Sequence, residues 1–286
     1  MPSLIDIRRR IRSVKNTQQI TKAMKMVSAA KLRRAQERVL AARPYSKMLR
    51  DMLTNVASAT TAEEVEGNPL LAVRETRNVL LIVITADRGL AGGFNGNLIK
   101  KAVAFTREHA DWNFTFELVG RKSRDFFRRR YKNVAGEMVG LFMKAPTYDN
   151  AQELARRVME AYSECKYDAV YVAVNEFKSV MAPTIAVNQL LPMEVPAGGD
   201  KIEYIYEQSP QELLGKLIPR YVETTLYRSL LESAAAEHAS RMTAMDAASS
   251  NASDVIDSLT LYMNRVRQAA ITKEIIEIVS GAAALE

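Results

Sequence analysis

Apolar residues at the start of the chain follow the spacing of an amphipathic helix. The first of them recur at intervals of three and four, which places them on one helical face: Leu4, Ile7, Ile11 and Val14. Ser3 and Asp6 have the spacing of an N-terminal capping pair, and Pro44 is the one proline that follows within a stretch free of glycine. We therefore expect one long helix over residues 1–58, whose apolar face packs against another helix.

Beyond Val14 this apolar spacing becomes irregular. Gln18 and Thr21 lie near the seam, and the stripe continues through four positions: Ile20, Met24, Val27 and Ala30. A strict seven-residue repeat is what a regular coiled coil requires. The sequence therefore predicts helix pairing here without an uninterrupted heptad pattern.

The middle of the chain has a different pattern, in which strands and helices alternate. Residues 59–76 contain Gly67, Asn68 and Pro69 and predict a linker. The apolar run from Asn78 to Thr85 is typical of a strand buried on both faces. Further strands are predicted at 114–119, 169–174 and, at an edge, within 184–195, with helices at 97–110, 123–131 and 150–165. This alternation predicts a Rossmann-like α/β domain over residues 77–208 with a mostly parallel sheet.

A second very long helix is predicted over residues 209–286. Ser209, Pro210 and Glu212 occupy the N-cap, first-turn and N3 positions of a helix start. Pro219 is expected to kink or restart this helix without ending it. Residues 233–253 are rich in alanine and serine, which lets a second backbone approach closely. An apolar stripe is then expected at Val255, Leu259, Tyr262, Val266, Ile271, Ile275 and Ile278.

Two long terminal helices around an inserted domain suggest that the chain ends pair with each other. The predicted fold class is α/β, with an antiparallel coiled-coil rod formed by residues 1–58 and 209–286. Long helices are poorly stabilised in water unless an apolar face is buried. The rod is therefore expected to need a surrounding partner where the apolar stripe no longer continues along the helices.

The charge of the chain is concentrated at its beginning. Residues 1–50 contain 14 Lys and Arg against Asp6 and Glu37, a formal charge of +12. The whole chain carries +7, so the other 236 residues carry −5. A basic segment of this kind attracts a nucleic acid, an anionic membrane surface or an acidic protein surface, and charge alone does not choose among them.

Motifs for chemistry are weak. The loop from Asp87 to Gly96 follows a predicted strand, but its glycine spacing matches neither phosphate-binding pattern, so a tight structural turn is favoured over nucleotide binding. His109, His238 and the single cysteine, Cys165, lack the spacing of a metal site. No nucleophile, base and orienting group can be recognised together. We therefore expect no catalysis, cofactor or metal in this chain.

A nucleic-acid-binding alternative rests on a second basic segment, residues 121–130, which lies beside Phe126, Phe127 and Tyr131. Basic helices are more often solvated surfaces, and these aromatic residues have the spacing of a hydrophobic helix face. A second alternative is an α/β enzyme that binds a nucleotide at the loop from Gly89 to Gly96.

Four segments together resemble the gamma subunit family of F-type ATP synthases. They span the chain in order, and the last carries the pattern I-T-x-E-x-x-E-x-x-x-G-A-x-A: residues 7–29, 87–95, 237–245 and 267–284. The resemblance implies a bacterial central stalk that is not itself an enzyme. Its terminal helices would rotate inside a ring of three alpha and three beta subunits, coupling proton flow to ATP synthesis or hydrolysis and regulating both.

The resemblance also implies partners and a location. The α/β domain would stand on the ring of membrane c subunits beside the epsilon subunit, so that membrane contact is only indirect. Without a presequence before Met1, we expect a peripheral protein on the cytoplasmic face of the bacterial plasma membrane. Nucleic acid would not be a partner.

Ten residues match positions where the family contacts its partners. Those implied for the beta-subunit loops are Lys22, Met24, Lys25, Arg267, Gln268, Thr272 and Glu274. Those implied for the c ring and epsilon are Tyr204, Tyr206 and Glu207. The two tyrosines fit equally well with an alternating edge strand that has one buried face.

Overall fold

The computed structural model describes residues 3–58, 68–177, 184–193 and 208–283. The chain divides into two compact units, and both long helices contribute to each of them. The α/β unit comprises Ala29–Arg241, and the helical unit comprises Met1–Ser28 together with Met242–Glu286. Helix α1 (Leu4–Ser58) and helix α6 (Pro210–Ala283) have the long extents that the sequence predicts.

A five-stranded sheet forms the centre of the α/β unit, in the order β3-β2-β1-β4-β5. Its strands are β1 (Asn78–Ile84), β2 (Asn113–Val119), β3 (Val134–Met138), β4 (Ala169–Glu176) and β5 (Thr184–Leu191). All neighbouring pairs are parallel except β4 and β5, which are antiparallel. This confirms the mostly parallel inserted sheet, to which the structure adds the unpredicted strand β3.

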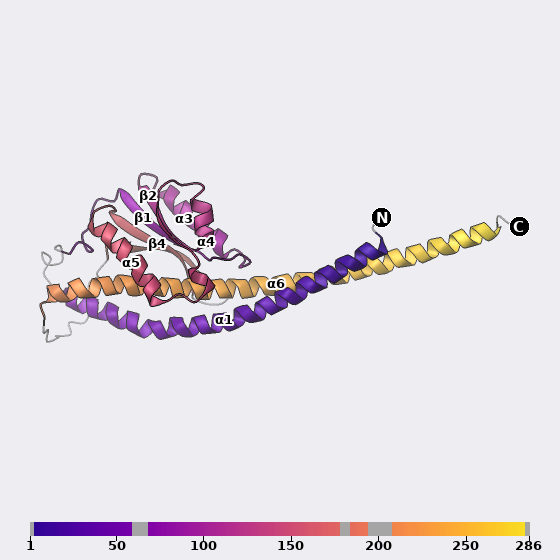
Figure 1. Ribbon diagram of the computed structural model, residues 1–286, viewed down its shortest axis with the longest axis horizontal. Coiled ribbons are helices and arrows are strands. Elements are labelled where there is room, and N and C mark those ends of the chain that lie inside the picture. Colours follow the sequence, from indigo (N-terminus) through magenta and orange to yellow (C-terminus); the bar gives the residue numbers. More distant parts are fainter. Residues whose placement is uncertain (1–2, 59–67, 178–183, 194–207, 284–286) are drawn as a thin grey trace. The chain divides into compact units, whose positions relative to one another are not determined.

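Helices cover both faces of this sheet (Figure 1). The three helices that follow the strands are α3 (Phe94–Glu108), α4 (Arg121–Phe127) and α5 (Tyr148–Ser163). Leu81 and Val83 pack with α3 and α4, whereas Leu80, Ile82 and Ile84 belong to the core formed with α5 and α6. Both faces of β1 are therefore apolar because both are covered.

One segment of helix α6 is buried on all sides within the α/β unit. Every residue from Leu230 to Glu237 is buried. The sheet and α5 pack on one side, and Leu53 and Val56 of α1 join the same core. The small side chains of this segment, such as Ala235 and Ala236, leave room for that close packing.

Side-chain caps begin both long helices, as the sequence predicts. At the start of α1, the Asp6 backbone N–H donates to Ser3 Oγ at 3.2 Å, and the Ser3 N–H donates to Asp6 Oδ2 at 3.3 Å. At the start of α6, the Glu212 N–H donates to Ser209 Oγ at 3.3 Å. These bonds satisfy donors that a helix start otherwise leaves free. Helix α6 then continues through Pro219.

In the helical unit, α1 and α6 run antiparallel. The hydroxyl oxygens of Thr21 and Ser249 lie 2.7 Å apart, and Gln18 Nε2 donates to the Ser249 carbonyl oxygen at 3.4 Å. Further along α1, Lys25 pairs with Asp246, an earlier residue of α6. Residues later in α1 therefore contact residues earlier in α6, as in an antiparallel pair.

The seam of α1 is more regular than its apolar residues suggest. Its covered positions repeat every seven residues in two registers. They are Leu4, Ile11, Gln18, Lys25, Leu32, Val39, Ser46 and Leu53, and Ile7, Val14, Thr21, Ser28, Ala35, Ala42, Leu49 and Val56. The expectation that the heptad pattern breaks after Val14 is therefore wrong.

Several residues assigned to the apolar stripe are exposed and lie outside the seam: Ile20, Val27 and Ala30 on α1, and Val255, Tyr262, Ile271, Ile275 and Ile278 on α6. Ile20 is 60% exposed, Val27 is 56% exposed and, on α6, Val255 is 43% exposed. Small and polar residues occupy the seam instead, because hydroxyl groups such as those of Thr21 and Ser249 bond to each other and to their own helices. A polar residue whose hydrogen bonds are satisfied can lie in a buried seam at little cost.

Candidate partner-binding surfaces

The first candidate surface lies on α1 of the helical unit. Lys22 is exposed, Met24 is partly covered, and Lys25 Nζ lies 2.6 Å from Asp246 Oδ1. The sequence identifies Lys25 as a partner-facing cation but gives no sign of this pair, whose members are 221 positions apart. Lys25 therefore already has an acidic partner within its own chain, whereas Lys22 has none among the described residues.

Exposed apolar residues flank these lysines. Met26 is 74% exposed, and Ile20 and Val27 are also on the surface. A basic helix surface that carries several large apolar side chains is unusual for a face that only meets water. This surface is consistent with one that another protein covers.

The second candidate surface is the C-terminal end of α6. The positions covered in the seam end at Ala270, and residues 271–281 are all exposed. Large apolar side chains lie among them: Ile271, Ile275, Ile276, Ile278 and Val279. No residue of α1 covers this segment, because the helix pairing of the helical unit ends before it.

The four residues predicted to bind partners near this end are all exposed: Arg267, Gln268, Thr272 and Glu274. Thr272 Oγ1 donates to the Gln268 carbonyl oxygen at 2.9 Å, a bond within the helix. Their side chains are otherwise available to a partner. The remaining predicted residues, Tyr204, Tyr206 and Glu207, lie outside the described residues.

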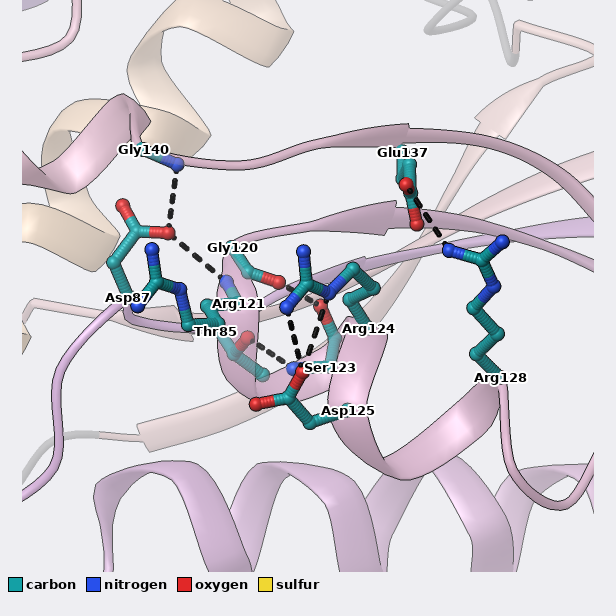
Figure 2. A network of polar contacts seen from close by, with 10 residues as sticks. All are labelled: Thr85, Asp87, Gly120, Arg121, Ser123, Arg124, Asp125, Arg128, Glu137 and Gly140. Atoms are coloured by element: carbon teal, nitrogen blue, oxygen red, sulfur yellow. Dashed lines mark hydrogen bonds and ion pairs between the residues drawn. The ribbon is translucent and has the colours of Figure 1, made fainter.

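The loop after β1 forms a polar anchor rather than an open phosphate cradle (Figure 2). Asp87 is 5% exposed, and its Oδ1 accepts the backbone N–H groups of Arg121 at 3.0 Å and Gly140 at 2.8 Å. Its Oδ2 accepts the N–H of Phe142 at 2.8 Å. One carboxylate thus joins β1 to the starts of α4 and of the 3₁₀ helix η1 (Leu141–Met143).

This arrangement has a direct consequence for nucleotide binding. Free N–H groups at a helix start are what binds a phosphate in nucleotide-binding α/β folds. Asp87 already takes such groups at the starts of α4 and η1. At the start of α3, the helix that follows this loop, the N–H groups of Phe94 and Asn97 donate to the carbonyl oxygens of Ala91 and Gly93. The geometry agrees with the structural turn that the sequence favours for this loop.

Arg241 of α6 also holds this loop and is itself paired with Glu237. Arg241 Nη2 donates to the Gly89 carbonyl oxygen at 3.2 Å, and Arg241 Nη1 lies 2.7 Å from Glu237 Oε1. Burial raises the pKa of Glu237, against the lowering effect of Arg241. The sequence gives no signal for this contact, because its partners are 152 positions apart.

The basic segment around α4 is largely engaged within its own domain. Arg124 lies 2.9 Å from Asp125, whose pKa its hydrogen bond lowers, and Arg128 lies 3.5 Å from Glu137 (Figure 2). The Arg130 guanidinium lies over the ring of Phe126, and Phe127 is fully buried. These rings pack on the domain core and are not free to stack on nucleic-acid bases.

Two further kinds of site are absent from the described residues. These residues contain no group of three or more His, Cys, Asp and Glu side chains that could hold a metal ion. Within the same residues, no helix has an apolar segment long enough to span a membrane.

Comparisons with known proteins agree along the whole chain. A family model described as ATP synthase matches residues 3–285. The ATP synthase gamma chain of Solibacter usitatus is 61% identical, and that of Pelotomaculum thermopropionicum is 55% identical, each over 100% of both chains.

Solved structures share the fold at lower identity. A chain from the mitochondrial ATP synthase of Euglena gracilis has a TM-score of 0.69 at 19% identity, covering 99% of this chain and 94% of its own. A chain from the central stalk and c-ring structure of the Tetrahymena thermophila enzyme has a TM-score of 0.62 at 23% identity, covering 80% and 99%. Together with the full-length relatives, these matches show that the chain belongs to the ATP synthase gamma chain family.

Proposed function

We propose that this gamma chain, the central rotor stalk of an ATP synthase, is a non-catalytic shaft turned by proton flow. In this proposal the helical unit rotates inside a ring of three alpha and three beta subunits. The α/β unit stands on the c ring beside epsilon, at the cytoplasmic face of a bacterial plasma membrane. The chain itself binds no cofactor, and ATP synthesis or hydrolysis takes place on the beta subunits.

The observation that carries this proposal is the uncovered end of α6. Residues 271–281 are exposed, and several of them are isoleucine or valine. A single helix with such side chains is poorly stabilised in water and gains most from a surrounding protein surface. A sleeve formed by a ring of subunits would cover this end on all sides and still allow it to turn.

Charge supports the proposed contact lower on the shaft. Residues 1–50 carry +12, and their exposed lysines and arginines suit acidic loops on the catalytic subunits. Exposed ion pairs contribute little individually, so they can be exchanged as the shaft turns. Solved structures of the Euglena gracilis mitochondrial enzyme are described as its rotor and as an assembly of OSCP, F1 and the c-ring, in agreement with such partners.

The alternative of a nucleic-acid-binding protein is not supported. The full-length relatives of this chain are gamma chains, and two arginines of the basic segment, Arg124 and Arg128, are paired with acidic residues of the same domain.

Charge reversal at Lys22 and Lys25 tests the shaft contact. In the complex assembled with alpha, beta, epsilon and the membrane sector, Lys22→Glu with Lys25→Glu is expected to reduce proton pumping per ATP hydrolysed several-fold. The physical reason is that a glutamate would face an acidic loop. The measurement compares ATP-driven acidification of vesicles with ATPase activity in the same preparation.

The Lys25–Asp246 pair calls for a matched control. Lys25→Glu combined with Asp246→Lys restores the pair between the two helices while leaving an acidic group at position 25. Coupling should stay impaired in this swap if Lys25 acts on a beta subunit. Full recovery in the swap, or unchanged coupling in Lys22→Glu, would show that these residues serve only the chain's own structure.

A further inference from the structure

A cavity of about 200 Å³ lies in the α/β unit between α1, the segment after η1, and α6. Its floor is apolar, formed by side chains that include Phe142 and Leu231. Its polar lining consists of Lys31, Arg34, Arg38, Lys144, Glu237 and His238. None of the residues of the proposed shaft contacts or of the loop after β1 lines this cavity.

The four basic residues around the cavity are all exposed. None of Lys31, Arg34, Arg38 and Lys144 forms an ion pair or a side-chain hydrogen bond within the described parts of the chain. The one carboxylate in the lining, Glu237, is already paired with Arg241 at 2.7 Å. Like charges gathered around a cavity make a positive potential that attracts an anion.

Two buried atoms of the lining also lack a partner. Glu237 Oε2 and His238 Nδ1 are inaccessible to solvent and form no hydrogen bond among the described residues. Burial, with the charges of Arg241 and Lys31, lowers the pKa of His238 to about 4, so its ring is neutral near pH 7. A buried polar atom without a partner indicates a missing ligand, ion or water.

We propose that this cavity binds inorganic phosphate or one phosphate group of a small phosphate ester, held by Lys31, Arg34, Arg38 and Lys144. Lysine and arginine are the side chains that bind phosphate oxygens most strongly. Hydrogen phosphate also carries one P–O–H group, which can donate a hydrogen bond to the Glu237 carboxylate. Sulfate near neutral pH carries no proton to donate.

Size argues for a small anion. Pockets that enclose a whole organic ligand usually have volumes of about 300–1,000 Å³. A volume of about 200 Å³ is smaller than this and suits a phosphate group. Phosphate binding at this site is separate from the proposed rotation. A negative result in the test of one proposal would leave the other unchanged.

Calorimetric titration of the full chain in phosphate-free buffer tests the proposal. We expect saturable binding of inorganic phosphate, at least tenfold weaker binding of sulfate, and no tighter binding of ADP than of phosphate. Arg34→Gln is expected to weaken phosphate binding at least tenfold. The matched control is Arg33→Gln, because Arg33 is a neighbouring arginine that pairs with Glu37 on the surface and does not line the cavity.

Lys144→Gln gives a second variant in which folding is not at risk, since Lys144 is exposed and lies outside the helices. It should also weaken phosphate binding. Absence of binding, equal affinities for phosphate and sulfate, or equal losses in Arg33→Gln and Arg34→Gln would overturn the proposal. ADP binding more than tenfold tighter than phosphate would replace it with a nucleotide site, and binding only of acidic peptides would replace it with a protein-docking surface.

Discussion

Replacing Gly120 by alanine is expected to lower the free energy of unfolding of the α/β unit by about 4 kcal/mol or more. Gly120 has φ +91° and ψ 151°, a backbone region that is essentially confined to glycine and costs another residue roughly 1–3 kcal/mol. An added Cβ would also lie 2.1 Å from the Thr85 carbonyl oxygen. Because that oxygen belongs to the backbone, it cannot move aside without displacing the loop that follows β1.

Gly140→Ala is the matched control for this change. Gly140 has φ +84°, but nothing lies within 4 Å of an added Cβ. The Gly140→Ala variant should therefore lose only the conformational cost of roughly 1–2 kcal/mol in unfolding free energy. Urea unfolding can be followed by the fluorescence of Trp112, the chain's single tryptophan, which stacks on His109. Equal losses in the two variants would show that the close contact with Thr85 carries no energetic weight.

Asp87→Ala is expected to cost roughly 3–5 kcal/mol of unfolding free energy. The substitution removes the acceptor of the backbone N–H groups of Arg121, Gly140 and Phe142. Hydrogen bonds to a charged acceptor contribute about 1.5–3 kcal/mol each, and buried donors left without a partner add a desolvation penalty. The same urea titration measures this loss.

Asp125→Ala separates the effect of burial from the loss of a negative charge. Asp125 accepts hydrogen bonds from the Arg124 side chain at the surface of α4. A surface pair of this kind contributes about 0–1 kcal/mol, so the control should change stability little. If Asp87→Ala were no more damaging than Asp125→Ala, Asp87 would not be the anchor of this loop.

Much of the central domain can be predicted from its hydrophobic pattern. The run at β1 is apolar on both faces because helices cover both, and the β-favouring residues of β2 and β4 also reveal their strands. Strand β3 escapes prediction for a physical reason. It is a five-residue edge strand that contains Gly136, and its register with β2 is interrupted. Its pairing with β2, rather than its own side chains, makes it a strand.

The helix seam shows where apolar spacing misleads. Its regular repeat passes through Gln18, Thr21 and Ser28, which a search for hydrophobic residues leaves out. Ile20 and Val27, which such a search includes, are exposed. The signal that defines the seam is the satisfaction of hydroxyl groups by the facing helix, and this requires knowledge of which helix residues face each other.

Some of the candidate site residues can be found from the sequence, whereas the contacts of others are known only from the fold. The resemblance of the N- and C-terminal segments places Lys22 and Glu274 on exposed helix surfaces, where a partner can reach them. The Lys25–Asp246 and Arg241–Gly89 contacts join parts of the chain more than 150 positions apart, and no local pattern predicts them. Asp87 likewise resembles part of a phosphate loop until its inward-facing hydrogen bonds are known.

The central claim is that this chain turns within a ring of catalytic subunits, and single-molecule observation tests it most directly. Cys165 is the only cysteine and is exposed, so a bead can be attached there without altering the chain. The complex would be reconstituted with cysteine-free alpha and beta subunits and fixed to a surface through them. If this chain is the rotor, ATP will drive sustained rotation of the bead in one direction. A bead that only fluctuates about a fixed position while the same complexes hydrolyse ATP would contradict that claim.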